Sequence, residues 1–227
     1  MEEEKRGFDP IENHAIPGRY EIEIEPNEEK NVSFIFSLEE NIDEIRVEEL
    51  IQNEENRLKA IVEDTKLITE NTEDKELIED FIITTDSFIA YRPSFGLHTI
   101  IAGYPWFLDW GRDSLISFEG LLLKTRRFNI AREVLLTFIR DIKSGLVPNG
   151  YSGYDNRPLY NSADASLLLF ENIKKYINYT NDYDFIKNNF YMCLKKIIEA
   201  YITGIDVDDN NIYMERDGLI HSGTINT

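Results

Sequence analysis

Residues 130–143 read Ile-Ala-Arg-Glu-Val-Leu-Leu-Thr-Phe-Ile-Arg-Asp-Ile-Lys, and this stretch decides the fold class. Its apolar residues recur at intervals of three and four, so they fall on one stripe of a helix. The members of that stripe are Ala131, Val134, Leu135, Phe138, Ile139 and Ile142. A helix with one apolar face must bury that face against other elements, which indicates a domain of packed helices.

The same period recurs on both sides of this stretch. It predicts an acidic helix from about residue 38, a helix over residues 77–88, a helix that follows residues 161–162, and a helix over residues 182–204. Asn161 and Ser162 are favoured N-cap residues, and Gly204 is suited to a helix end. Strand patterns between these helices are weak, so we expect αα-hairpins that pack against one another.

Residues 20–36 show the alternation of a β-hairpin instead. Apolar residues alternate with other residues over 20–25 and 32–36, and the polar residues 27–30 can form the connection. Two strands alone bury too little surface to be stable in water. We therefore expect this hairpin to pack on other structure, either the helices or a larger sheet.

The composition excludes several classes of protein. With 227 residues and 42% hydrophobic residues, the chain can form a sizeable core, which excludes a mainly disordered protein. The single cysteine, Cys193, and the three widely separated histidines form no metal-ligand spacing, and no glycine-rich phosphate loop occurs. We expect no metal and no cofactor. Neither a signal peptide nor a membrane-spanning run is found, so we expect a cytoplasmic protein with no membrane partner.

The net charge of −19 is distributed unevenly. Residues 1–90 contain 27 acidic and 9 basic residues, whereas residues 91–227 contain 16 acidic and 15 basic residues. A polyanion would meet a like-charged surface and no basic excess, so we do not expect nucleic acid as a partner. The acidic stretch itself is typical of a solvated surface.

Residues 102–113 read Ala-Gly-Tyr-Pro-Trp-Phe-Leu-Asp-Trp-Gly-Arg-Asp, the most unusual stretch of the chain. The aromatic and charged residues that it brings together include Trp106, Asp109, Trp110, Arg112 and Asp113. Sugars present apolar C–H faces and hydroxyl groups, so their sites combine aromatic rings with planar charged groups. We expect Arg112 to donate to sugar hydroxyls and Asp113 to accept from them, along one rim.

A structural role would explain the same residues. Arg112 and Asp113 could form an ion pair at the start of a helix, with the tryptophans as core residues. Asn161 could cap the next helix, and Asp164 could interact favourably with its dipole. The residue types alone leave both interpretations open.

Three motifs, in this order, resemble the amylo-α-1,6-glucosidase domain of the glycogen debranching enzymes. They are residues 102–113, Gly145-Leu-Val-Pro-Asn149 and Tyr160-Asn-Ser-Ala-Asp-Ala-Ser166, and the resemblance spans roughly residues 85–227. It implies a mainly α fold, part of an (α/α)6 toroid of helical hairpins that follows a β-rich domain. On this basis we expect residues 1–37 to be the β-hairpin tail of that domain, 38–75 an acidic helical linker, and 76–227 the first half of the toroid.

The resemblance also implies a function. Family members hydrolyse the α-1,6 bond to a branch glucose of glycogen or a related α-glucan, with inversion at the anomeric carbon. The pair at Arg112 and Asp113 would bind the glucose in the cleaved position, and Trp106 and Trp110 would line its pocket. The expected substrate-binding residues are Trp106, Asp109, Trp110, Arg112, Asp113, Asn161 and Asp164.

The chain departs from the family pattern near its last residue. In family members the segment that matches 217–227 leads into a Thr-Trp-Met-Asp motif whose aspartate is the general acid. We therefore expect no catalytic residue within these 227 residues, weak binding of glycogen or maltooligosaccharide, and no hydrolysis. Uncovered helix faces could drive self-association. The alternative is a non-catalytic α-glucan-binding module.

Overall fold

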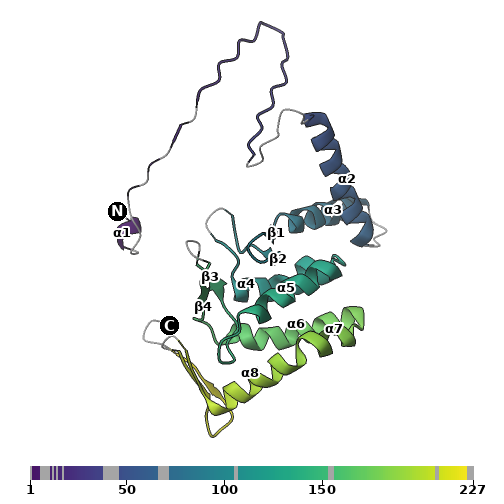
Figure 1. Ribbon diagram of the computed structural model, residues 1–227. Coiled ribbons are helices and arrows are strands. Elements are labelled where there is room, and N and C mark those ends of the chain that lie inside the picture. Colours follow the sequence, from purple (N-terminus) through teal and green to yellow (C-terminus); the bar gives the residue numbers. More distant parts are fainter. Residues whose placement is uncertain are drawn as a thin grey trace. The chain divides into compact units, whose positions relative to one another are not determined.

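The computed structural model describes residues 2–5, 11, 13, 15, 16, 18–37, 46–65, 72–104, 107–152, 156–207 and 210–223. The chain divides into two compact units, Met1–Ile51 and Gln52–Thr227 (Figure 1). Among the described residues, no helix is sufficiently long and apolar to cross a membrane.

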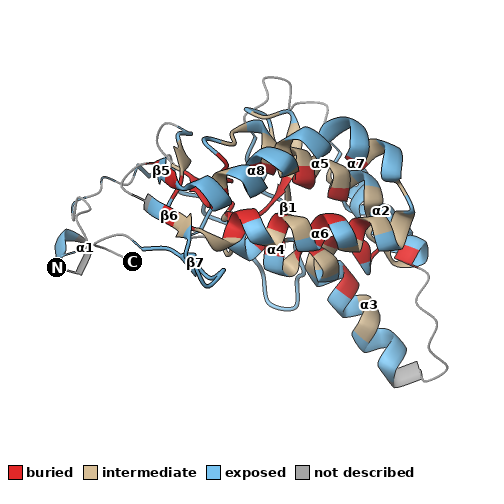
Figure 2. Cartoon of the chain, turned by 90° about the horizontal axis from the view of Figure 1, so that it is seen from below, coloured by how far each residue is buried: buried red, intermediate tan, exposed pale blue. Residues whose placement is uncertain are grey.

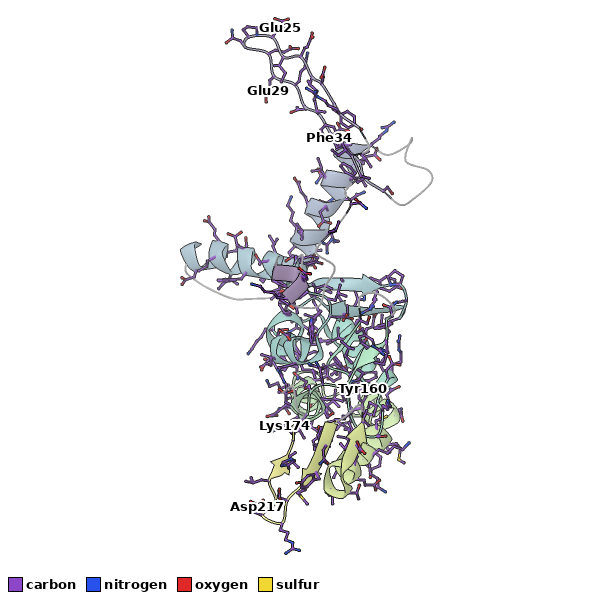
Figure 3. The ribbon with its side chains drawn as sticks, turned by 90° about the vertical axis from the view of Figure 1, so that its left-hand side faces the viewer. Glu25, Glu29, Phe34, Tyr160, Lys174 and Asp217 are labelled. Atoms are coloured by element: carbon purple, nitrogen blue, oxygen red, sulfur yellow. The ribbon has the colours of Figure 1, made fainter. Side chains whose placement is uncertain are left out.

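The first unit contains the short helix α1 (Glu2–Lys5) and an extended segment that turns back at Pro26 and Asn27. Across this turn the rings of Tyr20 and Phe34 meet edge to face, with centroids 4.7 Å apart. Figure 3 shows Glu25 and Glu29 near the turn and Phe34 on the returning arm.

The chain turns back on itself where the hairpin was predicted, but the two arms do not form strands. No strand is formed over residues 18–37, and the apolar side chains that were expected to be half-buried are exposed. Two strands that cover no other apolar surface bury too little area to be stable, and this explains why the pairing does not form.

Helices dominate the rest of the chain, which confirms the mainly α class. They are α2 (Val47–Thr65), α3 (Thr72–Asp86), α4 (Gly111–Phe118), the π-helix η1 (Glu119–Leu123), α5 (Phe128–Arg140), α6 (Asp164–Thr180), α7 (Tyr183–Asn189) and α8 (Tyr191–Thr203). The helix predicted over residues 182–204 is two helices, which break at Phe190 and end at Gly204.

Three small antiparallel sheets lie between and after the helices. They pair β1 (Ile89–Arg92) with β2 (Leu97–Ile100), β3 (Gly150–Tyr151) with β4 (Pro158–Leu159), and β5 (Ile205–Val207) with β6 (Asn210–Met214) and β6 with β7 (Ile220–His221). These short strands were not predicted from the sequence, although they leave the chain mainly helical. Strands of two to five residues are too short for their alternation to stand out in a sequence.

The core lies between α4, η1, α5 and α6. Phe118, Leu122 and Leu135 have no exposed surface, and neither does Leu169 of α6. Figure 2 shows this burial as red on the facing sides of α4 and α6. On α3 the predicted inward positions Leu77 and Phe81 are exposed and Ile82 is buried instead, so the phase assigned to that helix was wrong.

Candidate functional site

Arg112, on the first turn of α4, forms an ion pair with Asp164 at the start of α6. Its Nε donates to Asp164 Oδ2 at 2.6 Å, and its Nη2 donates to Oδ1 at 3.1 Å. Two parallel hydrogen bonds fix the plane of the guanidinium group as well as its position. The first and third motifs, 52 residues apart in the sequence, therefore meet here.

The second motif joins them through Asn149. Its Oδ1 accepts from the backbone N–H of Arg112 at 3.2 Å, and its Nδ2 donates to Asn161 Oδ1 at 3.1 Å. Asn149 is almost fully buried. The sequence places Asn149 in the second motif but does not predict its role. The one signal for that role is its position as a polar residue directly after Pro148 in a loop.

A close approach of two backbones places these side chains. Gly111 donates its N–H to the carbonyl of Asn149 at 2.7 Å, and a Cβ atom at Gly111 would lie 2.5 Å from the carbonyl oxygen of Pro148. Only glycine fits such an approach without a shift of the loop. On the other side, Trp110 forms a β-bridge with Gly150, which lies against the indole ring.

Asp113 lies near the charge of Arg112 but is not hydrogen-bonded to it. Its carboxylate forms no hydrogen bond or ion pair with any described residue, because Arg112 pairs with Asp164 instead. The ion pair of the structural interpretation is therefore present at a helix start, but the partner of Arg112 is Asp164 rather than Asp113. A carboxylate that is exposed and unpaired is available to accept hydrogen bonds from a ligand.

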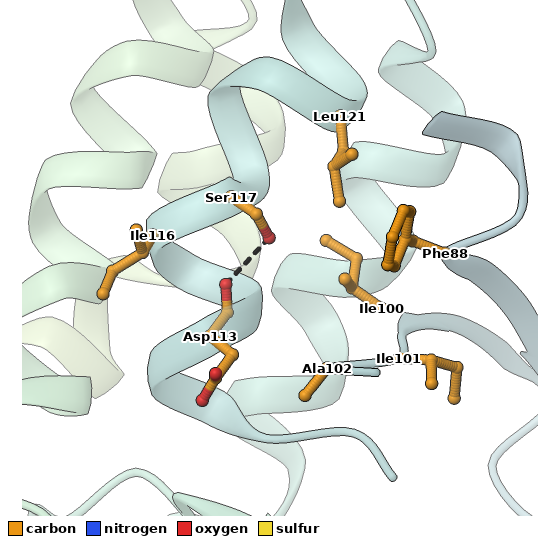
Figure 4. Close-up of a pocket in the computed structure, with 8 residues that line it drawn as sticks. All are labelled: Phe88, Ile100, Ile101, Ala102, Asp113, Ile116, Ser117 and Leu121. Atoms are coloured by element: carbon orange, nitrogen blue, oxygen red, sulfur yellow. Dashed lines mark hydrogen bonds between the residues drawn. The ribbon is translucent and has the colours of Figure 1, made fainter. Parts of the chain in front are cut away.

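An open hollow of about 300 Å³ adjoins this carboxylate. Figure 4 shows Phe88, Ile100 and Leu121 beside the ribbon of α4 and η1, with Asp113 at the lower end. The other lining residues are Ile101, Ala102, Ile116 and Ser117. The hollow is mostly apolar, with a charged acceptor at one end, and this combination suits a ligand with apolar faces and hydroxyl groups.

Asp164 stays ionised in this arrangement. Partial burial would raise the pKa of its carboxyl, but hydrogen bonds from Arg112 and Ser162 outweigh burial and lower the pKa below its usual value. Asp164 in turn raises the pKa of Arg112. The N-cap of α6 is Ala163 rather than the predicted Asn161 or Ser162, but Ser162 still accepts from the backbone N–H of Ala165 in the first turn, at 3.2 Å.

Asp109 lies deeper than the other site residues. Only 5% of it is exposed, and both carboxylate oxygens contact Nη1 of Arg92. Thr99 adds a hydrogen bond to Oδ2 at 3.2 Å. We expected Asp109 to contact a ligand directly, but in the structure its carboxylate is buried and bound to Arg92.

The structure brings together most of the predicted site residues. Arg112, Asn161 and Asp164 share one hydrogen-bonded cluster, Trp110 and Asp113 adjoin it, and Asp109 lies behind it. Trp106 lies outside the described residues. Among the described residues, no group of three potential ligands could hold a metal ion.

Comparison with known proteins identifies this set of motifs. The family model of amylo-alpha-1,6-glucosidase matches residues 83–227. The chain is also similar to the glycogen debranching enzyme of Saccharomyces cerevisiae (strain ATCC 204508 / S288c), with 36% identity over 90 residues, which is 37% of this chain and 6% of that protein. It thus spans a small part of the length of that relative. Since the family match covers more than half of the chain and includes all three motifs, the chain belongs to the amylo-α-1,6-glucosidase family.

Proposed function

We propose that residues 83–227 bind the branch glucose of an α-glucan, as part of a glycogen-debranching glycoside hydrolase. The unpaired Asp113 carboxylate beside the Arg112–Asp164 ion pair carries this proposal. The first turn of α4 thus carries both an acceptor and a held guanidinium, which are the groups that recognise sugar hydroxyls. The family match and the printed name of the yeast relative support the same substrate class.

Each side chain has a distinct part in this proposal. Nε and Nη2 of Arg112 are held by Asp164, so Nη1 is left to donate to the sugar. Asp113 accepts from a hydroxyl group, Asp164 holds the guanidinium of Arg112, and Asn161 accepts a hydrogen bond from Asn149. The ring of Trp110 is assigned to pack against the C–H groups of the sugar, and Trp106, which lies outside the described residues, is assigned to the same pocket from its motif alone.

The chemistry of an inverting glycosidase needs one more pair of groups. A carboxylic acid protonates the leaving oxygen, and a carboxylate about 6.5–9.5 Å away activates water. Asp164 is unsuited to donate a proton, because its ion pair lowers its pKa. In this proposal the acid and the base of the inverting reaction are not among residues 1–227. These residues bind the glucan weakly and do not hydrolyse it.

The remaining expectations belong to the same proposal. The helices form part of an (α/α)6 toroid, and exposed apolar side chains such as Ile198 and Ile202 of α8 provide the faces for self-association. A cytoplasmic setting would keep the one thiol, Cys193, reduced.

Calorimetric titration with an α-1,6-branched maltooligosaccharide tests this proposal. We expect saturable binding that Asp113→Asn weakens by about tenfold, since one charge-assisted hydrogen bond is lost. The matched control is Asp184→Asn, which alters an exposed carboxylate on the first turn of α7 and should leave the affinity unchanged.

Three results would count against the proposal. Equal affinity of the wild type and Asp113→Asn would remove Asp113 from the site. Release of glucose by the wild-type chain, above a blank with Asp113→Ala, would show that the catalytic pair lies within these residues. Equal affinity for branched and linear oligosaccharides would favour the alternative of a glucan-binding module over a branch-specific site.

A further inference from the structure

Arg92 joins three separate parts of the structure. It is the last residue of β1, and only 15% of its side chain is exposed. Nη1 contacts both carboxylate oxygens of Asp109, and Nη2 donates to Asn156 Oδ1 at 2.5 Å. Its guanidinium also lies over two aromatic rings, 4.3 Å from the centroid of Phe95 and 5.2 Å from that of Tyr151.

These contacts hold the chain immediately before the candidate site. Asp109 precedes Trp110, the residue before α4, whose first turn carries Arg112. On the other side of Arg92, Tyr151 belongs to β3, which begins at Gly150, the bridge partner of Trp110. Arg92 therefore contacts both of the segments that form the β-bridge between Trp110 and Gly150.

The same contacts occupy the Asp109 carboxylate. With both oxygens on Arg92 and a further hydrogen bond from Thr99, little of its capacity to accept hydrogen bonds is left for a sugar. It is also buried, whereas Asp113 is exposed. A direct substrate contact by Asp109 would first require this cluster to open.

We propose that Arg92 and Asp109 are positioning residues that fix Trp110 and Arg112 for the sugar, and that Asp109 does not itself contact the ligand. This inference rests on the proposed function for its ligand. It reassigns one residue of the site and adds Arg92, for which neither the motifs nor the family match supplies a role.

The chain contains a matched control. Arg132 of α5 pairs with Asp182, the residue before α7, and its guanidinium lies 4.8 Å from the ring centroid of Phe185. This cluster has the same chemistry as the Arg92 cluster, an arginine between a carboxylate and an aromatic ring. It lies among other elements, so its loss should lower stability and leave the site unchanged.

The first experiment needs no ligand. In a Trp106→Phe background Trp110 is the one remaining tryptophan, so acrylamide quenching of its fluorescence reports on its packing. We expect Arg92→Met to raise the quenching constant about twofold as the local packing loosens. Arg92→Lys keeps the charge, so its quenching constant should lie between those of Arg92→Met and the parent. The quenching constant of Arg132→Met should equal that of the parent. An unchanged constant in folded Arg92→Met and Arg92→Lys would overturn the positioning role.

The second experiment is a double-mutant cycle on the affinity for the branched oligosaccharide. We expect Arg92→Met and Asp109→Asn each to weaken binding by about tenfold, and the double variant to bind no more weakly than either single variant. Additive losses would show that Asp109 contacts the sugar directly and would overturn the reassignment. If the wild-type chain does not bind, the proposed function fails, while the quenching result still decides the positioning role.

Discussion

Arg112 and Asp113 are neighbours in the sequence, but they interact with different parts of the molecule. Successive residues on a helix point about 100° apart, so side chains at i and i+1 do not face each other. Arg112 reaches Asp164 on α6, and Asp113 lines the hollow with Phe88 and Ile101. One turn of α4 thus supplies both an anchored cation and a free anion.

The Arg112–Asp164 ion pair predicts a pH dependence. The pKa of Asp164 is lower in the folded chain than in the unfolded chain, so the ion pair stabilises the fold above the unfolded pKa, near 4. This stabilisation is lost as the pH falls through the folded pKa. Because both side chains are nearly half exposed, we expect about 0.5–1 kcal/mol at pH 7.

Urea denaturation of the wild type and Asp164→Asn at pH 7 and at pH 3 measures this effect. The difference in unfolding free energy should be fully present at pH 7 and smaller at pH 3, because the ion pair is lost as the pH falls. Asp184→Asn removes a first-turn carboxylate that pairs with no described residue, so it measures the contribution of the helix dipole alone and should show a smaller difference at pH 7 than Asp164→Asn. A difference for Asp164→Asn that persists unchanged at pH 3 would contradict the account.

Residue types predicted which side chains lie near one another more reliably than they predicted the hydrogen bonds between them. Trp110, Arg112 and Asp113 were found because their types are unusual together, and Asn161 and Asp164 because they belong to a motif. The roles of Asn149 and Arg92 depend on partners that lie 37 and 17 residues away. Such pairings follow from the packed fold, so one sequence cannot specify them.

At the scale of the element, α4 and η1 separate the core from the hollow. Phe118 is fully buried at the end of α4, whereas Ile116, two residues earlier, is largely exposed and lines the hollow. The two faces of this helix therefore differ in their surroundings. The inner face packs in the core, and the outer face borders the hollow.

This division predicts a contrast between two substitutions. Phe118→Ala should lower the free energy of unfolding by about 3–5 kcal/mol, because it leaves a cavity in a fully packed core. Ile116→Ala removes a side chain that is already exposed and should cost about 0.5 kcal/mol or less. Thermal or urea denaturation followed by circular dichroism gives both values, and similar losses for the two variants would contradict the assignment of faces.

The elements differ in how well a sequence predicts them. The helix over residues 130–143 was predicted because six apolar residues repeat at the helical period. In the structure this helix is α5, which spans Phe128–Arg140. On α3 the apolar residues are too evenly spread to fix the phase, so Ile82 was missed as the buried position. The short strands were missed because pairing between distant segments, rather than local pattern, forms them.

At the scale of the whole molecule, the fold brings distant motifs to one place. Residues 109–113, 145–149 and 160–166 are separated in the sequence, yet hydrogen bonds join all three within the second compact unit. Most of the negative charge lies outside them, in residues 1–90. The predicted site thus occupies the nearly neutral part of the chain.

The central claim is that these three motifs form one site for a glucose unit. Nuclear magnetic resonance tests it most directly, because the indole N–H of Trp110, the Nε–H of Arg112 and the side-chain amides of Asn149 and Asn161 each give a separate signal. On addition of the branched oligosaccharide we predict shifts of these signals with one common dissociation constant, and no shift of the side-chain amide of Asn189 on α7. Unshifted signals from the three motifs, or shifts confined to other elements, would contradict the account.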